Sequence, residues 1–269
     1  LYVHLMDTHH PYAPPPPYDT MYGETENVPA PMELFKTSTR LLRSDALGEL
    51  KDIELEKLKD YYDGTIRISD DQIGRLVEKA LEVSGERETI VVITADHGDE
   101  FMEHGSLYHN NLVIEELIHI PLVMWSSKRF ERGTTVDCLV RHADVLPTLA
   151  DIIGAPVPAE AVGQSLVPLL EGKLDSIDVE SISEGDFCAA LNSGDWKIMR
   201  VDTTDSFHLM DLTLEPREKI DLSSTHPERF EKLHGRLSEY LVEAKKIRRA
   251  MEAEADEDTI RELKALGYI

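Results

Sequence analysis

The stretch Thr89-Ile90-Val91-Val92-Ile93-Thr94-Ala95-Asp96-His97-Gly98 carries the strongest fold signal in this chain. Its first six residues are all β-branched, which is typical of a strand buried in a parallel sheet. Ligands of open α/β sheets bind beyond the carboxyl ends of the strands, where Asp96 and His97 fall. A carboxylate and an imidazole both coordinate metals, so the pair predicts a divalent-cation site. A structural role, with Asp96 capping a helix, is the alternative.

Strands and helices alternate on both sides of this stretch. Apolar runs and helical periodicity predict further strands over 1–6 and 118–125, and helices over 34–58, 58–83 and 142–153. After Pro156 the pattern changes to short strands near 182, 187–191 and 196–201, followed by helices over 227–252 and 258–266. We therefore expect an α/β domain over residues 1–155 and a small α+β subdomain over residues 156–269.

Composition narrows the possible partners. The 269 residues include 52 acidic and 28 basic side chains, a net charge of −24, so nucleic acids and anionic membranes would be repelled overall. No apolar run approaches the roughly 18 residues of a membrane span. We expect a soluble chain, with the cytoplasm favoured, although neither compartment nor oligomeric state follows from the sequence. Cys138 and Cys188 are expected to be buried thiols, and an apolar run opening at Leu1 predicts that residues precede it.

Two further loops carry candidate site residues. His9 and His10 lie in a loop stiffened by Pro11 and Pro14–Pro17, where an imidazole could bind an oxyanion or protonate a leaving group. His109 and Asn110 could hold an anionic oxygen in the same way. Each of these residues could instead be an ordinary surface residue. Possible additional metal ligands are Asp7, Asp99, Glu100 and Glu103.

Several of these segments, in order, resemble the sulfatase family. The opening run Leu1 to Tyr12 is similar to the family's "Leu-x-x-His-x-x-Asp-Pro-His-x-Pro-Tyr", and Thr94 to Gly105 is similar to its "Thr-Ser-Asp-His-Gly-Glu … Asp-His-Gly" block. The resemblance extends over nearly the whole chain, through the segments 70–76, 109–122, 144–149, 208–216 and 263–268.

The resemblance implies an alkaline-phosphatase-like fold, a sandwich of a mostly parallel sheet with helices on both faces. It implies that Asp96 and His97 bind the metal, with Ca²⁺ expected and Mg²⁺, Mn²⁺ or Zn²⁺ as alternatives. His9 and His109 take the catalytic positions, and His9, His109 and Asn110 contact the substrate. The family's nucleophile motif, Cys/Ser-x-Pro/Ala-x-Arg, is absent from the sequence, so no nucleophile is assigned in this chain.

The implied function is metal-dependent hydrolysis of a small sulfate ester, with these residues expected to be a fragment that lacks the nucleophile. Two alternatives remain open. The same fold serves phosphodiesterases and phosphonate monoester hydrolases, which also act on tetrahedral oxyanions. The chain could also be a non-catalytic domain or an inert fragment. The physiological ester does not follow from the sequence.

Overall fold

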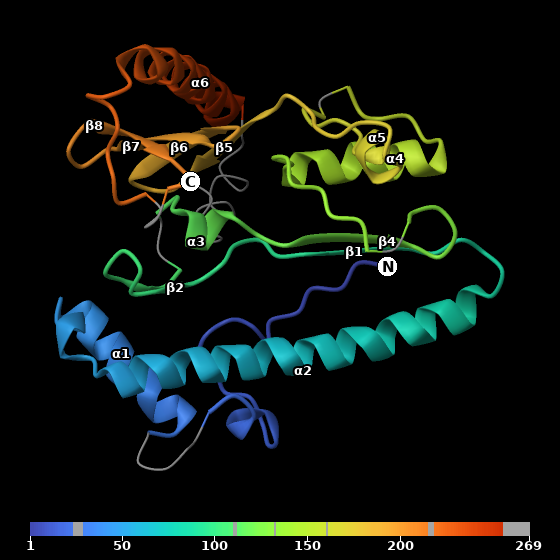
Figure 1. The fold of residues 1–269 in the computed structure, drawn as a ribbon, viewed down its shortest axis with the longest axis horizontal. Helices are drawn as coiled ribbons and strands as arrows, with labels where there is room; N and C mark the ends of the chain where they lie inside the picture. Colours follow the sequence, from blue (N-terminus) through green and yellow to red (C-terminus); the bar gives the residue numbers. More distant parts are fainter. Residues whose placement is uncertain (24–28, 110–111, 132, 160, 215–217, 255–269) are drawn as a thin grey trace. The chain divides into compact units, whose positions relative to one another are not determined.

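The structure is a computed structural model that describes residues 1–23, 29–109, 112–131, 133–159, 161–214 and 218–254. These residues form two compact units (Figure 1). The first comprises Leu1–Asn110, Ile114–Thr135 and Leu170–Lys173, and the second comprises Asn111–Val113, Val136–Leu169 and Leu174–Ile269. The expected division at residues 155 and 156 stays a prediction, because compactness alone does not define a domain.

Two helices dominate the first unit. Helix α1 spans Pro31–Arg43 and begins with proline at its first turn, where the missing N–H has no intrahelical acceptor to lose. Helix α2 spans Asp52–Ser84, after the short turns η1 (Tyr18–Thr20) and η2 (Leu47–Glu49). The core of this unit is built by apolar side chains of both helices, the turn η2, the proline loop and residues 107–108: Tyr12, Leu34, Leu41, Leu47, Leu58, Tyr61, Leu107 and Tyr108. The sequence predicted two helices that meet at residue 58; two helices are present, but the break between them lies at 44–51, so the predicted boundary is wrong.

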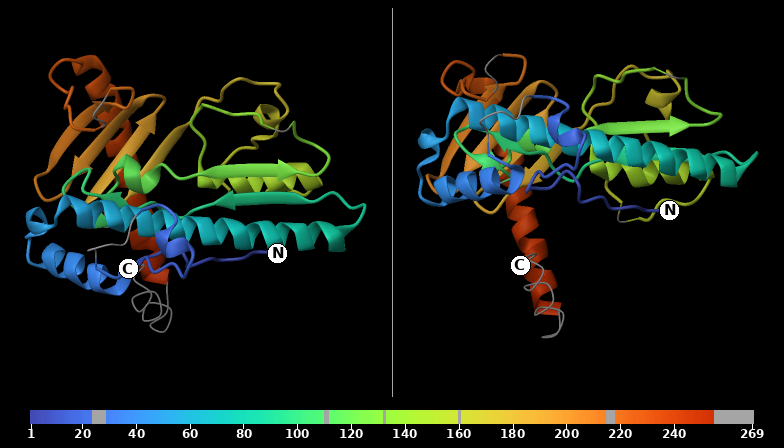
Figure 2. Two further views of the ribbon diagram at one scale, coloured as in Figure 1. Left: turned by 60° about the horizontal axis from the view of Figure 1, so that its bottom comes forward. Right: turned by 90° about the horizontal axis from the view of Figure 1, so that it is seen from below.

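The strands of the first unit form two antiparallel ribbons. Strand β1 (Ile90–Thr94) pairs with β4 (Leu122–Ser126), and β2 (Glu100–Phe101) pairs with β3 (Leu107–Tyr108). The sequence predicts mostly parallel pairing, and for the strands described here that prediction is wrong. The connection between β1 and β4 contains the β2–β3 hairpin and the four-residue helix α3 (Glu115–Ile118), and it returns the chain to pair antiparallel with β1. Helix α2 runs alongside the β1–β4 ribbon (Figures 1 and 2).

Residues 1–6 do not form the expected strand. They have no regular secondary structure and are exposed, and Leu1 and Tyr2 have 103% and 87% of their surface accessible. A strand is defined by pairing with a neighbour, and no described residue pairs with this run. Apolar character therefore predicted a strand that hydrogen bonding does not support.

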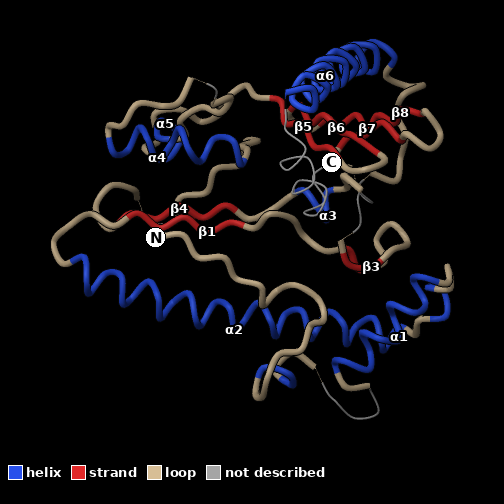
Figure 3. The backbone as a smooth tube through the Cα atoms, turned by 180° about the vertical axis from the view of Figure 1, so that it is seen from behind, coloured by secondary structure: helices blue, strands red, loops and turns tan. Residues whose placement is uncertain are grey.

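The second unit contains a four-stranded antiparallel sheet in the order β5-β6-β7-β8, formed by Glu180–Glu184, Cys188–Ser193, Trp196–Val201 and Ser206–Asp211. Helix α6 (Pro227–Glu254) covers one face of this sheet, as Figure 3 shows. Leu233 and Leu237 of α6 pack on Leu191, Ile198 and Leu209. The predicted strands near 182, 187–191 and 196–201 and the helix from 227 are confirmed. The helix expected over 258–266 lies outside the described residues.

A buried polar network explains the segment 144–149 that resembles the sulfatases. Helix α4 (Val145–Ile153) follows the turn η3 (His142–Asp144) and ends at Gly154 in the left-handed conformation, φ 68°. The carboxylate of Asp144, fully buried, accepts hydrogen bonds from Arg141 and from the backbone N–H of Gln164. The short helix α5 (Val167–Leu170) follows. This segment is structural, because its carboxylate is already satisfied inside the unit.

The second unit also contains a fully buried ion pair. Lys197 of β7 and Glu218 lie 2.7 Å apart, and Lys197 donates to the carbonyl of Val113 at 2.5 Å. This links the segment before α3 to the sheet. Among the described residues, no helix combines the length and hydropathy required to cross a membrane.

Candidate active site

The β2–β3 hairpin brings Asp99 and His109 together. Its register places Glu100 opposite Tyr108, so the residues that flank this pair, Asp99 and His109, meet at the open end of the hairpin. Their side chains are in contact, with His109 Nδ1 3.1 Å from Asp99 Oδ1. At the closed end, Glu100 Oε1 accepts the backbone N–H groups of His104 and Ser106 and holds the turn. Glu100 is therefore better explained as a structural residue than as the additional ligand considered above.

Asp99 is a buried carboxylate with both oxygens engaged. Its side chain is 5% exposed, and its second oxygen accepts the hydroxyl hydrogen of Tyr12 at 2.7 Å. The hydrogen bond to Asp99 raises the pKa of His109 above its ordinary value, against the opposing effect of burial, and the negative charges of Asp99 and Asp96 add to the increase. A carboxylate only accepts, so Nδ1 of His109 donates and Nε2 faces away. The Tyr12–Asp99–His109 chain thereby fixes the orientation of this imidazole.

The backbone of Tyr108 is strained at the position before His109. Its φ of 66° is in the left-handed region, which aromatic residues rarely occupy, at a cost of about 1–3 kcal/mol. The buried side chain holds the residue there, because the Tyr108 hydroxyl and Ser38 Oγ on α1 are 2.5 Å apart. The position that aims His109 is thus anchored to a helix of the same unit.

Asp96 and His97 follow β1 directly, as predicted. His97 Nδ1 lies 2.9 Å from the carbonyl oxygen of Gly98, which can only accept, so the proton is on Nδ1 and the Nε2 lone pair is free. That Nε2 lies 3.9 Å from Asp96 Oδ1. Metal bonds of about 2.0–2.4 Å let a single cation contact both atoms. The side chain of His97 is 40% exposed and that of Asp96 is 77% exposed, so the pair is accessible and fits a divalent cation.

Gly98 allows two backbone segments to approach closely. A Cβ at this position would lie 2.1 Å from the carbonyl oxygen of Glu116, and the Gly98 N–H donates to the carbonyl of Leu117 at 2.8 Å. The contact fixes the chain directly after His97. Any side chain here forces the backbone to shift.

Replacing Gly98 with alanine should therefore destabilise the chain by about 1–3 kcal/mol, the usual cost of overpacking, and should move His97. The measurement is the free energy of unfolding by urea, together with the calcium-induced increase in Tm. The matched control is Gly74→Ala in α2, where nothing lies within 4 Å. That change should stabilise the helix by up to about 1 kcal/mol. Equal effects of the two alanines would contradict the close-approach role of Gly98.

The proline loop brings His9 and His10 to the same place. The ring of His9 is 4.9 Å from that of His109 and 4.2 Å from that of His10, measured between ring centres. His9 is exposed, whereas His10 is partly buried against Phe35 and Tyr108. Burial, with the neighbouring histidines, lowers the pKa of His10 to about 4, so this ring is neutral at neutral pH.

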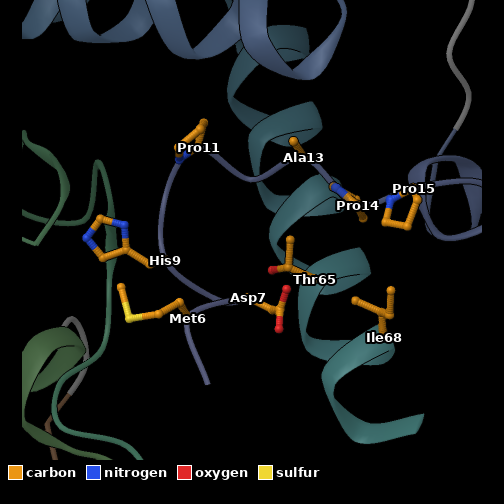
Figure 4. A pocket seen from close by; sticks show the side chains of 9 residues that line it. All are labelled: Met6, Asp7, His9, Pro11, Ala13, Pro14, Pro15, Thr65 and Ile68. Carbon is orange, nitrogen blue, oxygen red and sulfur yellow. The ribbon is translucent and has the colours of Figure 1, made fainter. Parts of the chain in front are cut away.

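A small pocket of about 180 Å³ lies beside this loop (Figure 4). Figure 4 shows Thr65 and Ile68 of α2 on one side of it and His9 with Met6 on the other. Asp7 points into the space between them. His9 therefore borders both the pocket and His109.

The candidate site residues predicted from the sequence are largely collected in one place. The ring of His109 lies between those of His9 and His97, with its centre 4.9 Å from that of His9 and 4.4 Å from that of His97. Asp96 is adjacent to His97, and Asn110 lies outside the described residues. Sequence reasoning missed the role of Tyr12, whose hydroxyl reaches Asp99 across 87 positions, and no local spacing signals that contact.

Comparison with known proteins identifies the family. The sulfatase family model matches residues 1–155, more than half of the chain, and the model of the C-terminal region of N-sulphoglucosamine sulphohydrolase matches residues 102–246. The chain therefore belongs to the sulfatase family. This confirms the predicted family, whose members are generally metal-dependent hydrolases of sulfate esters.

Individual relatives agree. Arylsulfatase K of Rattus norvegicus is 26% identical over 213 residues, covering 74% of this chain and 37% of the relative. The N-acetylglucosamine-6-O-sulfatase of Bacteroides thetaiotaomicron is 32% identical over 116 residues, covering 43% of this chain and 20% of the relative. The chain thus spans well under half the length of the curated relatives it matches.

Solved structures show the fold. The phosphonate monoester hydrolase of Agrobacterium radiobacter matches with a TM-score of 0.65 and 21% identity, covering 87% of this chain and 55% of that chain. The predicted alkaline-phosphatase-like α/β fold class is thereby confirmed.

Proposed function

We propose that this chain supplies the cation-binding and leaving-group side of the active site of a metal-dependent sulfuric ester hydrolase. The observation that carries the proposal is the placement of Asp96 and His97 beside the hydrogen-bonded pair Asp99–His109. Membership of the sulfatase family supports the choice of reaction.

Asp96 and His97 are the proposed metal ligands, with Ca²⁺ as the expected cation. A hard cation suits the exposed carboxylate oxygen, and His97 presents its Nε2 because its Nδ1 is held by Gly98. A bound cation would offset the negative charge that develops on the ester oxygens during displacement. The nearby histidines are the anion-binding groups, because the net charge of −24 provides no general attraction for a sulfate.

His109 is the proposed proton donor to the leaving oxygen. The hydrogen bond to Asp99 raises the pKa of His109, which favours the protonated ring, and Nε2 is the N–H that this form presents to the leaving oxygen. His9 is the proposed contact to the sulfate or the leaving oxygen. Its Nδ1 donates to the carbonyl of His10, so Nε2 is the atom that remains for the substrate. Asn110 is proposed as an additional substrate contact on the same segment as His109.

The proposed substrate is a sulfate monoester of a small alcohol, and a sulfated amino sugar is the specific class we favour. The named activity of the Bacteroides thetaiotaomicron relative, an N-acetylglucosamine-6-O-sulfatase, supports that class. We also propose that residues 1–155 and 156–269 are separate domains, with the proposed catalytic residues in the first.

The test is a comparison of ester classes with the natural full-length protein. We expect calcium-dependent release of sulfate from 4-nitrophenyl sulfate and from glucosamine 6-sulfate, with lower kcat/KM for phenyl phosphonate and bis-4-nitrophenyl phosphate. The reverse preference would assign the chain to the phosphonate and phosphodiester branch of the same fold. Absence of turnover with all esters, combined with no calcium-induced increase in Tm, would indicate a non-catalytic domain.

A further inference from the structure

Three histidines converge beside the proposed calcium ligands. One ring nitrogen from each of His9, His10 and His109 lies within 4.8 Å of those of the other two. The three rings, which we call the histidine cluster, come from the proline loop and from the end of the β2–β3 hairpin. All three lie in the first unit.

Two members of the cluster are already oriented as metal-binding histidines usually are. A ligating imidazole typically donates its other N–H to a carboxylate or a backbone carbonyl, which fixes the ring and its tautomer. His109 Nδ1 donates to Asp99, and His9 Nδ1 donates to the carbonyl of His10. Both rings therefore present the Nε2 lone pair when they are neutral.

His10 provides an independent sign of a ligand. Its Nδ1 is buried and makes no hydrogen bond with the residues that the structure describes, although an orphaned buried polar group costs about 1–3 kcal/mol. The ring is held in place by Phe35 and Tyr108, at 5.5 and 4.6 Å between ring centres. Coordination through this nitrogen would give it the polar partner that the described residues do not supply.

We propose that the histidine cluster binds a divalent transition metal of the zinc class, at a site distinct from the proposed calcium site. A site made only of imidazole nitrogens favours Zn²⁺, Cu²⁺ or Ni²⁺, whereas Ca²⁺ binds where carboxylate oxygens are present, as at Asp96. A tetrahedral zinc with bonds of about 2.0–2.1 Å needs ligand nitrogens about 3.4 Å apart. Closing the cluster to that spacing requires a shift of the His9 ring, which is exposed on its loop.

A competing arrangement shares His109. One ligand atom of each of His97, Asp99 and His109 also lies within 4.8 Å of the others. In that group Asp99 has both oxygens committed, to Tyr12 and to His109. Asp99 therefore serves as the hydrogen-bond partner of a coordinated His109, and the three-histidine arrangement leaves it in place.

Zinc at this site has a consequence for catalysis, which rests on the proposed function. It would occupy the ring nitrogens of His9 and His109 that the substrate and the leaving oxygen require. We expect zinc to inhibit sulfate ester hydrolysis at concentrations at which calcium activates it. Binding itself does not depend on turnover.

The test measures zinc binding by calorimetry with calcium in excess, so that oxygen-rich sites are filled. We expect His10→Ala and His9→Ala each to weaken zinc binding by at least about 10- to 100-fold, because loss of an outer-shell partner alone costs that much and each variant removes a proposed ligand. His119→Ala, at a side chain that is 69% exposed, should leave it unchanged. Asp96→Ala should also retain zinc binding. Co²⁺ should give the visible absorption of a nitrogen-coordinated tetrahedral ion, and His9→Ala should remove it.

Zinc affinity that is the same in both histidine variants as in the parent would overturn the proposal, as would its loss in Asp96→Ala. His9→Ala carries the test if His10→Ala does not fold, because His9 is exposed. Zinc binding without any ester hydrolysis would uphold this inference and count against the proposed function. Hydrolysis without zinc binding would do the reverse.

Discussion

Asp96→Ala should lower kcat/KM for sulfate ester hydrolysis by about 10²- to 10³-fold, the usual cost of losing one electrostatic contact in an active site. The same variant should lose the calcium-induced increase in Tm, because stabilisation by a ligand disappears with its binding. Its own stability should change by less than about 0.5 kcal/mol. The reason is that the Asp96 side chain is 77% exposed and its only hydrogen bond described here is to the neighbouring N–H of His97.

This combination separates a metal ligand from a structural residue. Removal of a helix-capping aspartate would lower the free energy of unfolding even without calcium, whereas removal of a calcium ligand lowers it only when calcium is present. The matched control is Asp70→Ala in α2, whose side chain is 72% exposed and 3.8 Å from Arg67. It should leave both kcat/KM and the response to calcium unchanged. A calcium response that survives in Asp96→Ala would remove this residue from the proposed metal site.

His109→Gln should reduce kcat by about 10²- to 10⁴-fold, the range for loss of a general acid, when the leaving group is a sugar alcohol. With 4-nitrophenyl sulfate the loss should be much smaller, since nitrophenolate leaves without protonation. The difference between the two esters is the readout, because misfolding would lower both rates equally. Glutamine retains a group able to donate to Asp99, which limits the loss of stability.

Two controls accompany this variant. His119→Gln replaces an exposed histidine of the first unit and should have no effect on either ester. Asp99→Asn retains the shape of the buried side chain but removes the charge that His109 Nδ1 contacts, and it should reproduce the dependence on leaving group in weaker form. Equal losses on both esters in His109→Gln would exclude leaving-group protonation and leave His109 as a binding residue.

The sequence predicted the local elements well. Helices α2, α4 and α6 follow from apolar periodicity and from Gly154 at a helix end, and β1 follows from its β-branched run. Strand pairing was less predictable, because a continuous apolar run is typical of parallel sheets but does not fix the direction of the partner strand, and β1 pairs antiparallel with β4. The run 1–6 illustrates the same limit, since hydrophobicity does not specify a hydrogen-bonding partner.

The candidate site was predictable in part. Asp96 and His97 could be found because a strand end is a local signal. The Asp99–His109 pair required the β2–β3 register, and the contact with Tyr12 required the tertiary fold. The orphaned nitrogen of His10 and the exposure of His9 could not be predicted, because two adjacent histidines in a sequence do not show which of them is buried.

The hydrogen bond between Tyr12 and Asp99 has a consequence for folding. It joins residues 87 positions apart, and the entropic cost of closing such a loop has to be met before the contact can form. Because non-local contacts generally form slowly, we expect the alignment of His109 to appear late in refolding, after α2 and the hairpin have formed. Recovery of activity would then lag behind recovery of helical circular dichroism, because activity returns only when tertiary folding is complete.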